Sequence, residues 1–428
     1  MKERIAKSFD IFANKLVRFS QERGRLSWWI FLFLLAFTLV SITPLTGNSQ
    51  SVINQPVEQI CQADPKREIR GVWLTNIDSD VLFEQDKTKE AIALLAKANF
   101  NTLYPTVWNW GYTLYPSEIA KSFTGLSLDP TEGLQGRDIL AEMVELGHEG
   151  GMRVIPWFEF GFMAPADSEL AKRHPEWLTA RQDGSNIWWE GNVHQRVWLN
   201  PLRPDVQQFM TDLIVEIVSN YDIDGIQLDD HFGYPSELGY DDYTVKLYQE
   251  EHDEQLPPED PQDPDWVRWR ADKITDYVET LFHQIKQHNP NAIVSVSPNP
   301  QHFSLNSFLL DWHRWERKGL IEELVVQLYR DDNDSFINEL EQPEIQAARE
   351  HIPVGIGILS GLKGRPIPWQ RIYQQVKIAR EHKFAGISFF FYESLWNLAK
   401  ESPTSRQAAL KNLLYHQTQP SQASDCKS

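Results

Sequence analysis

The feature that most constrains this chain is a regular alternation of short apolar runs with longer helical patterns. Eight runs rich in β-branched and aromatic residues predict strands, and they span Ile69–Asn76, Asn101–Trp108, Arg153–Phe160, Gly225–Asp230, Ile293–Asn299, Leu324–Arg330, Pro353–Leu359 and Gly386–Glu393. Helical patterns follow the strands at Lys89–Ala98, Arg137–Glu149, Pro204–Asn220, Trp266–His288, Asn306–Lys318, Ser335–His351, Trp369–His382 and Ser405–Tyr415.

Strands that alternate with helices pair in parallel through right-handed crossovers. Eight such units predict a closed (β/α)8 TIM barrel, because an open sheet of eight strands would leave two edges to cover. A doubly wound sheet is the alternative, and it is disfavoured because no glycine-rich phosphate loop follows the first strand. We therefore expect one barrel over residues 67–416, followed by a tail over residues 417–428.

The N-terminal segment differs from the barrel in charge and hydropathy. Residues 1–26 have seven Lys and Arg against three Asp and Glu, whereas the whole chain carries a net charge of -19. Residues 27–45 hold no charge and have a continuous apolar centre. This resembles a signal peptide or a signal anchor, with the basic residues in the cytoplasm and the rest exported. A buried core helix is the alternative.

Two signals bear on whether the apolar segment is removed. Its short length favours cleavage, which would give a periplasmic or secreted protein. The long basic segment and the missing A-x-A site favour retention as an anchor, with the barrel on the periplasmic side of the inner membrane. Residues 46–66 are polar and Gln-rich, and we expect them to be a linker.

Export also affects how the two cysteines are interpreted, because disulfides persist in oxidising compartments. Cys61 precedes the predicted barrel and Cys426 follows it, so a bridge between the chain ends is one hypothesis and two inert thiols are the other.

The acidic charge argues against nucleic acid as a partner, because phosphate binding depends on clustered Lys and Arg.

Polar and aromatic side chains gather near the C-terminal ends of the predicted strands, where active sites of such barrels lie. These candidates are Asn76, Trp108, Trp157, Glu159, Gln227, Asp229, Asp230, His231, Asn299, Gln327, Tyr329, Tyr392 and Glu393. Since the packed layers of a barrel need Val, Ile and Leu, this ring predicts a binding cleft. Gln227 and Asp229 lie on the same side of their strand, and we expect both to face the barrel axis.

Carboxylates, amides and tryptophans in one cleft suit carbohydrate chemistry, and glycosidic cleavage usually needs two carboxyl groups. Glu159 is flanked by Trp157 and Phe160, whose apolar surfaces would raise its pKa, so we assign it as the general acid. Asp229 is assigned the ionised role of nucleophile or base. Asp230 would bind sugar hydroxyls or orient His231, and Glu393 is a reserve acid. No cofactor or metal is expected.

Several motifs together carry a family resemblance. They are "REIRGVWLTNIDSDVL" (Arg67–Leu82), "VWLNPLRPDVQQF" (Val197–Phe209), "DGIQLDDHFGYP" (Asp224–Pro235), "VSPNP" (Val296–Pro300) and "VVQLYR" (Val325–Arg330). As a set they resemble the glycosyl hydrolase-like 10 family, also known as DUF187, in its cyanobacterial form. The resemblance implies an exported barrel that acts on glycans, and one branch cleaves peptidoglycan strands that lack peptides. Asn200, within the second motif, is a further candidate for substrate binding.

The segment "DGIQLDD" is also similar to the "DGxRxD" motif of the α-amylase clan, whose last Asp is the nucleophile and would correspond to Asp229. That clan has its acid, a Glu, at the end of the fifth strand, where this chain has "SPNP". The acid must therefore come from another strand.

Two other functions compete with a glycoside hydrolase. A non-catalytic glycan-binding barrel would keep the Trp and Asn residues but would not need two ionisable groups in one pocket. A metal-dependent hydrolase or deacetylase could use Asp229, Asp230 and His231 as ligands. This second alternative is disfavoured because no H-x-H motif follows the first strand.

Overall fold

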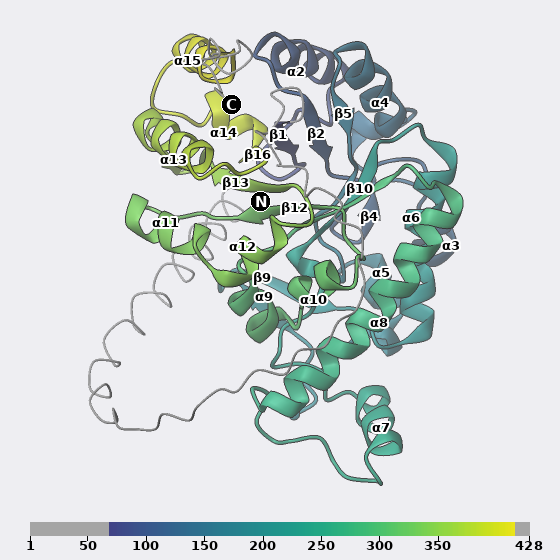
Figure 1. Ribbon diagram of the computed structural model, residues 1–428. Coiled ribbons are helices and arrows are strands. Elements are labelled where there is room, and N and C mark those ends of the chain that lie inside the picture. Colours follow the sequence, from purple (N-terminus) through teal and green to yellow (C-terminus); the bar gives the residue numbers. More distant parts are fainter. Residues whose placement is uncertain (1–67, 416–428) are drawn as a thin grey trace, which may run out of the picture.

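The computed structural model describes residues 68–415 (Figure 1). All eight predicted strands are present in it. They form one parallel sheet in the order β5-β2-β1-β16-β13-β12-β11-β10-β6. The strands of this sheet are β1 (Ile69–Leu74), β2 (Thr102–Pro105), β5 (Arg153–Val154), β6 (Trp157–Phe158), β10 (Gly225–Asp229), β11 (Ile293–Ser297), β12 (Glu323–Gln327), β13 (Val354–Leu359) and β16 (Gly386–Phe390).

The sheet closes on itself through its third predicted strand. β5 pairs with β2, and β6 pairs with β10, while only Ile155 and Pro156 separate β5 from β6. Pro156 has no N–H to give to a neighbouring strand, which accounts for the interruption. Its carbonyl still accepts the N–H of Gln227 at 2.8 Å. β5 and β6 are thus two halves of one strand, and the predicted (β/α)8 barrel is confirmed.

Helices surround the barrel, and several of them pack on it through one apolar face. In α6 (Pro204–Asn220) the buried residues recur at three- and four-residue spacing from Val206 to Val218, and Pro204 occupies the first turn, where it costs no hydrogen bond. The other surrounding helices are α2 (Gln85–Lys97), α4 (Ile139–Glu149), α8 (Pro264–His288), α9 (Gln301–Phe308), α10 (Trp312–Arg317), α11 (Asn333–Leu340), α12 (Pro343–Ala348), α13 (Trp369–Glu381) and α15 (Pro403–Tyr415).

Two helices predicted as continuous are each broken in two. The predicted helix Asn306–Lys318 is wrong as a single element, because Leu309 has a left-handed backbone (φ 58°) that ends α9 before Asp311 caps α10. The predicted helix Ser335–His351 is interrupted before Pro343, whose missing N–H makes it a first-turn residue of α12.

Additional segments follow the C-terminal ends of several strands, and they surround the predicted cleft. A hairpin of β3 (Trp108–Asn109) and β4 (Tyr112–Thr113) precedes α3 (Glu118–Thr124). The long insert after β6 contains a small sheet ordered β7-β9-β8. Its elements are β7 (Met163–Pro165), α5 (Glu169–Arg173), β8 (Trp188–Glu190) and β9 (His194–Trp198).

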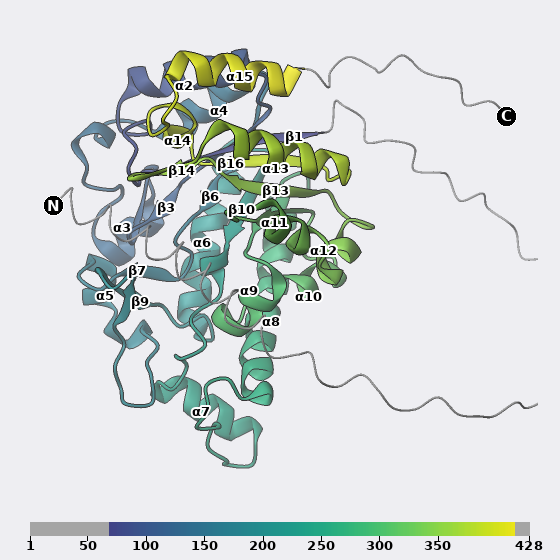
Figure 2. The same ribbon diagram turned by 90° about the vertical axis from the view of Figure 1, so that its left-hand side faces the viewer.

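The remaining strands are followed by shorter additions. α7 (Asp242–Glu251) comes after β10 and projects from the barrel in both views (Figures 1 and 2). The hairpin of β14 (Gly361–Leu362) and β15 (Arg365–Pro366) follows β13, and α14 (Tyr392–Trp396) follows β16. These additions make the C-terminal end of the barrel much more elaborate than a minimal barrel would be.

Several predictions concern residues outside the described range. They are the basic segment 1–26, the apolar segment 27–45, the linker 46–66, the tail 417–428 and the pair Cys61 and Cys426. Within residues 68–415, no helix is both long enough and apolar enough to cross a membrane.

Candidate active site

A small cavity of about 70 Å³ lies at the C-terminal end of the barrel. Its walls combine strand ends with residues of the additional segments. The lining residues are Ile77, Trp157, Glu159, Phe160, Glu190, Asp229, Asp230, His231, Asn299, Gln327, Tyr329, Leu359, Leu362 and Phe390. Four carboxyl groups therefore face one cavity, and they belong to Glu159, Asp229, Asp230 and Glu190.

Glu159 follows β6 and is almost fully buried, yet its carboxyl group is well supplied with hydrogen bonds. Its Oε2 accepts from Thr106 Oγ1 and from Asn109 Nδ2, both at 2.8 Å. The single hydroxyl hydrogen of Thr75 is shared between Oε2 at 2.8 Å and Oε1 at 3.0 Å. Oε2 is thus fixed, and Oε1 is the oxygen better placed to carry a proton.

Burial raises the pKa of Glu159 to about 7, because the charged form is poorly solvated inside the barrel. The hydrogen bonds from Thr106, Thr75 and Asn109 and the charge of His231 all act in the opposite direction and keep the pKa from rising further. A carboxyl group with a pKa near neutrality is suited to donate and accept a proton in the same reaction cycle.

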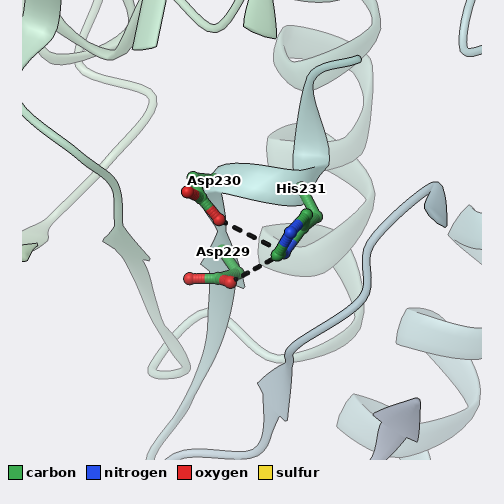
Figure 3. A group of neighbouring side chains, drawn as sticks. All are labelled: Asp229, Asp230 and His231. Atoms are coloured by element: carbon green, nitrogen blue, oxygen red, sulfur yellow. Dashed lines mark hydrogen bonds and ion pairs between the residues drawn. The ribbon is translucent and has the colours of Figure 1, made fainter. Parts of the chain in front are cut away.

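Asp229, Asp230 and His231 form a compact cluster at the end of β10 (Figure 3). The Nδ1 atom of His231 lies 3.1 Å from Asp229 Oδ2 and 3.2 Å from Asp230 Oδ1. Alternation along the strand predicted that the two aspartates would point to opposite sides. They share one cavity because β10 ends at Asp229, and Asp230 already belongs to a 3-10 turn (Asp230–Phe232).

Each aspartate also has its own amide partner. Asp229 Oδ1 accepts from Gln327 Nε2 at 2.7 Å and from Ser297 Oγ at 3.1 Å. Asp230 Oδ2 accepts from Asn299 Nδ2 at 2.5 Å. The ends of β11 and β12 therefore hold the two carboxylates in place.

The charges in this cluster are strongly coupled. Burial would lower the pKa of His231, but the negative charges of Asp230 and Asp229 outweigh burial and raise it to about 10, so the imidazole is a cation at neutral pH. Burial and the neighbouring charge of Asp230 raise the pKa of Asp229 well above its ordinary value, and the hydrogen bond and charge of His231 offset only part of this rise. His231 is therefore the internal counter-ion of the two aspartates.

The same three residues are the candidates for a metal site among the described residues, since ligand atoms of Asp229, Asp230 and His231 all lie within 4.8 Å of one another. The geometry at His231 does not fit this role well. Its Nδ1, the nitrogen that faces both aspartates, is 2.9 Å from the carbonyl oxygen of Glu159. A carbonyl only accepts, so Nδ1 carries a hydrogen and cannot bind a metal while this bond exists.

Eight of the predicted site residues line the cavity: Trp157, Glu159, Asp229, Asp230, His231, Asn299, Gln327 and Tyr329. Three others are buried nearby without lining it. Gln227 accepts from Trp73 Nε1 at 2.7 Å inside the barrel, and Asn76 accepts from Asn109 Nδ2 at 2.8 Å. Trp108 donates its Nε1–H to the carbonyl of Gly161 at 2.8 Å.

The structure does not bring Asn200, Tyr392 and Glu393 to the cavity. Asn200 donates to Asp241, which caps α7, and to Thr244 in its first turn. Tyr392 packs on Trp396, with ring centroids 5.2 Å apart. Glu393 accepts from Ser79 Oγ at 3.1 Å and from Asn397 Nδ2 at 2.6 Å.

Sequence reasoning missed Glu190 and the two threonines that hold Glu159. Thr75 and Thr106 each directly follow a barrel strand, so the strand-end rule that selected the other candidates could have found them. Glu190 comes from β8 in the insert, where nothing in the local sequence indicates proximity to β10. It is paired with Arg196 at 2.7 Å, and Arg196 in turn lies over the ring of Phe160.

Comparisons with known proteins show which family and fold the chain resembles. Residues 68–378 match the family described as glycosyl hydrolase-like 10. Glycosyl hydrolase DigH of Escherichia coli (strain K12) is 24% identical over 322 residues, which cover 67% of this chain and 70% of DigH. Glycosyl hydrolase YngK of Bacillus subtilis (strain 168) is 26% identical over 276 residues, which cover 58% of this chain and 48% of YngK.

Solved structures with a similar fold include the glycoside hydrolase domain of PgaB (BpsB) from Bordetella bronchiseptica, with a TM-score of 0.55 and 11% identity over 78% of this chain and 99% of that domain. The catalytic domain of β-amylase from Paenibacillus polymyxa has a TM-score of 0.56 and 12% identity over 83% of this chain and 99% of that domain. At these identities the two structures support the barrel fold alone.

Proposed function

This chain belongs to the glycosyl hydrolase-like 10 family, and we propose that it is a glycoside hydrolase that cleaves O-glycosidic bonds in a cell-envelope glycan. Peptidoglycan strands that lack peptides are the proposed substrate, as the resemblance described above implies. Export of the barrel to the periplasmic side of the inner membrane, through the segment of residues 27–45, is part of this proposal.

The observation that carries the proposal is the presence of Glu159 and Asp229 in one cavity but in different surroundings. Glu159 has hydroxyl and amide partners, with a pKa of about 7. Asp229 lies beside the cationic His231 and a second carboxylate. Glycosidases need this kind of pair, one carboxyl group that supplies a proton and one that is ionised.

In the proposed reaction Glu159 donates its proton, carried on Oε1, to the oxygen of the scissile bond. Asp229 acts on the anomeric carbon as nucleophile, or it activates a water that attacks this carbon. The cationic His231 balances the negative charge of Asp229 and Asp230. Asn299 and Gln327 orient the two carboxylates through their hydrogen bonds. Trp157, Phe160 and Phe390 offer aromatic surface to the apolar faces of a sugar ring.

The test is digestion of purified peptidoglycan, before and after amidase treatment, by the full chain and by three variants. Asp229→Asn and Glu159→Gln remove the two proposed catalytic carboxylates with almost no change in size. Glu393→Gln is the matched control, because Glu393 also follows a barrel strand but lies outside the cavity. Fragments identified by mass spectrometry should appear with the wild-type protein and with Glu393→Gln only.

Other outcomes would indicate the competing functions. Retention of the glycan by all four proteins without any fragments would indicate a non-catalytic binding barrel. Release of acetate without cleavage of the glycan strands would indicate a deacetylase. Loss of activity in Glu393→Gln with full activity in Glu159→Gln would transfer the role of the acid to Glu393.

A further inference from the structure

An open groove of about 750 Å³ lies between α13 and α15, away from the catalytic cavity. Its lining is largely apolar at one end and charged at the other, and it consists of Trp369, Tyr373, Lys377, Arg380, Glu381, Ala409, Asn412 and Leu413. Tyr373 is 41% exposed, which is unusual for so large an apolar side chain in this molecule. Both views show α13 and α15 on the same side of the barrel (Figures 1 and 2).

Both ends of the described chain meet at the charged end of this groove. Arg380, which lines it, binds Glu68 Oε1 through Nε at 2.8 Å and the carbonyl of Leu413 through Nη1 at 2.8 Å. Asn99 Nδ2 also donates to the carbonyl of Leu414 at 2.8 Å. The first described residue and the last turn of α15 are therefore fixed to each other beside the groove.

Two segments of the chain leave the barrel at this point, and their composition differs. Residues 416–428 contain no Val, Ile, Leu, Met, Phe, Trp or Tyr, so they offer little apolar surface to a groove lined by Trp369, Tyr373 and Leu413. The residues that precede Glu68 include Val57 and Ile60. Removing such side chains from water is the main source of free energy for docking in an apolar groove.

The N-terminal segment is also long enough. Ile60 lies eight residues before Glu68, and an extended chain spans roughly 3.3–3.6 Å per residue, so Ile60 can reach about 27 Å from Glu68. The groove runs along α13 from Arg380 to Trp369, which is about 17 Å at 1.5 Å per helical residue. Val57 and Ile60 can therefore reach the aromatic end of the groove.

We propose that the segment Val57–Cys61 docks in the groove between α13 and α15. The docked segment would run along α13 toward Trp369, while Glu68 itself lies immediately before β1, at the end of the barrel where the strands begin. The catalytic cavity lies at the opposite end of the strands. The docked segment therefore leads toward the cavity end of the barrel, and this inference does not depend on the reaction that is catalysed.

The test uses disulfide trapping in the full chain. Cys426→Ser leaves Cys61 as the sole native cysteine, and Ala409→Cys adds a partner in the groove. We expect mild oxidation to link Cys61 to the introduced cysteine within one chain, as seen by peptide mass spectrometry. Gln208→Cys on α6 is the distance control, because α6 is next to β10, across the barrel from α13, and the side chain of Gln208 is exposed.

A flexible tether near the groove could also form this disulfide without docking. The deciding comparison is therefore the rate of disulfide formation with and without the additional substitutions Val57→Asp and Ile60→Asp. Docking predicts that these substitutions slow bond formation by about tenfold or more, because a docked segment has a higher effective concentration than a free tether. An unchanged rate would refute the proposal. Bonds between two chains would instead assign the groove to a second copy, and faster formation of the bond after deletion of residues 416–428 would assign the groove to the tail. If Ala409→Cys does not fold, Asn412→Cys, which is exposed, replaces it.

Discussion

At the scale of single residues, the hydrogen bonds to Glu159 make a direct prediction about pH. A general acid must be protonated, so kcat should fall as the pH rises through about 7, the pKa of Glu159. Thr106 donates to the ionised form and lowers this pKa. Thr106→Val should therefore move the alkaline limb of the kcat profile upward by about 1 pH unit.

The matched control for this change is Thr113→Val. Thr113 is equally buried but donates to the carbonyl of Ser127, away from Glu159. Its variant should keep the wild-type pH profile. An alkaline limb that stays in place in Thr106→Val would mean that another group supplies the proton.

The cluster around Asp229 predicts two shifts of opposite sign in the acid limb of kcat/KM. Asp230→Asn removes a neighbouring negative charge, so the pKa of Asp229 should fall and activity should extend to lower pH. His231→Gln removes the counter-ion, so the pKa of Asp229 should rise and activity should be lost at higher pH than in the wild type. Each shift should be about 1 pH unit or more.

Carboxyl carbon NMR titration of the same variants would measure the coupled pair without any turnover. If both variants moved the acid limb in the same direction, the electrostatic account of the cluster would be wrong. The aspartates would then act through geometry alone.

The candidate residues show what the sequence could and could not predict about the site. Strand ends were sufficient to select Asp229, Asn299 and Gln327, because the C-terminal ends of parallel strands meet at one end of a barrel. They could not separate these from Glu393, whose carboxylate is held by Ser79 and Asn397 outside the cavity. The position of Glu190 in the cavity depends on how the insert after β6 folds back on the barrel, and no local sequence pattern predicts this.

At the scale of elements, the barrel strands were predictable because their apolar runs are continuous and regularly spaced. The helix breaks were harder, since Leu309 is an ordinary apolar residue whose left-handed backbone is imposed by the packing of α9 and α10. Pro343, in contrast, was a visible signal for the start of α12. The predicted helix Asn306–Lys318 thus failed at a position without a local sequence signal, whereas the break in Ser335–His351 could have been predicted from Pro343.

The hairpin of β14 and β15 carries a prediction about access to the cavity. A cavity of about 70 Å³ is well below the roughly 300–1,000 Å³ of ordinary ligand pockets. Leu362 of β14 forms part of its wall, and the adjacent Lys363 pairs with Asp78 at 3.2 Å. We expect this hairpin to move away from the loop after β1 when a glycan enters.

A reversible cross-link tests this expectation. The variant carries Cys61→Ser and Cys426→Ser, which remove the native thiols, and Asp78→Cys and Lys363→Cys, which introduce two new ones. A bifunctional thiosulfonate reagent would join the two introduced cysteines. Activity should fall at least about tenfold when the link forms and return when a reductant removes it. Each single cysteine variant treated with the same reagent is the control, and full activity in the linked protein would show that the hairpin does not control entry.

At the scale of the whole molecule, the contact between the two ends of the described range, residues 68 and 413–415, gives a reason to expect a bond between Cys61 and Cys426. Both cysteines lie outside the described residues, but Glu68 and Leu413 are joined through Arg380. Cys61 is seven residues before Glu68 and Cys426 is eleven after Tyr415, so extended segments of about 24 and 38 Å can easily bring the two sulfurs together.

A disulfide at this position would close a loop around the entire barrel and restrict the unfolded chain. Peptide mapping without reduction, on the full chain recovered from an oxidising compartment, should yield one linked peptide that contains both cysteines. Cys61→Ser should lower the free energy of unfolding by about 2–5 kcal/mol in denaturant titrations of the oxidised protein, and the reduced wild-type protein should match the variant. If both cysteines react with an alkylating agent before reduction, the chain ends are held together by Arg380 and its partners alone, and Cys61→Ser should then leave stability unchanged.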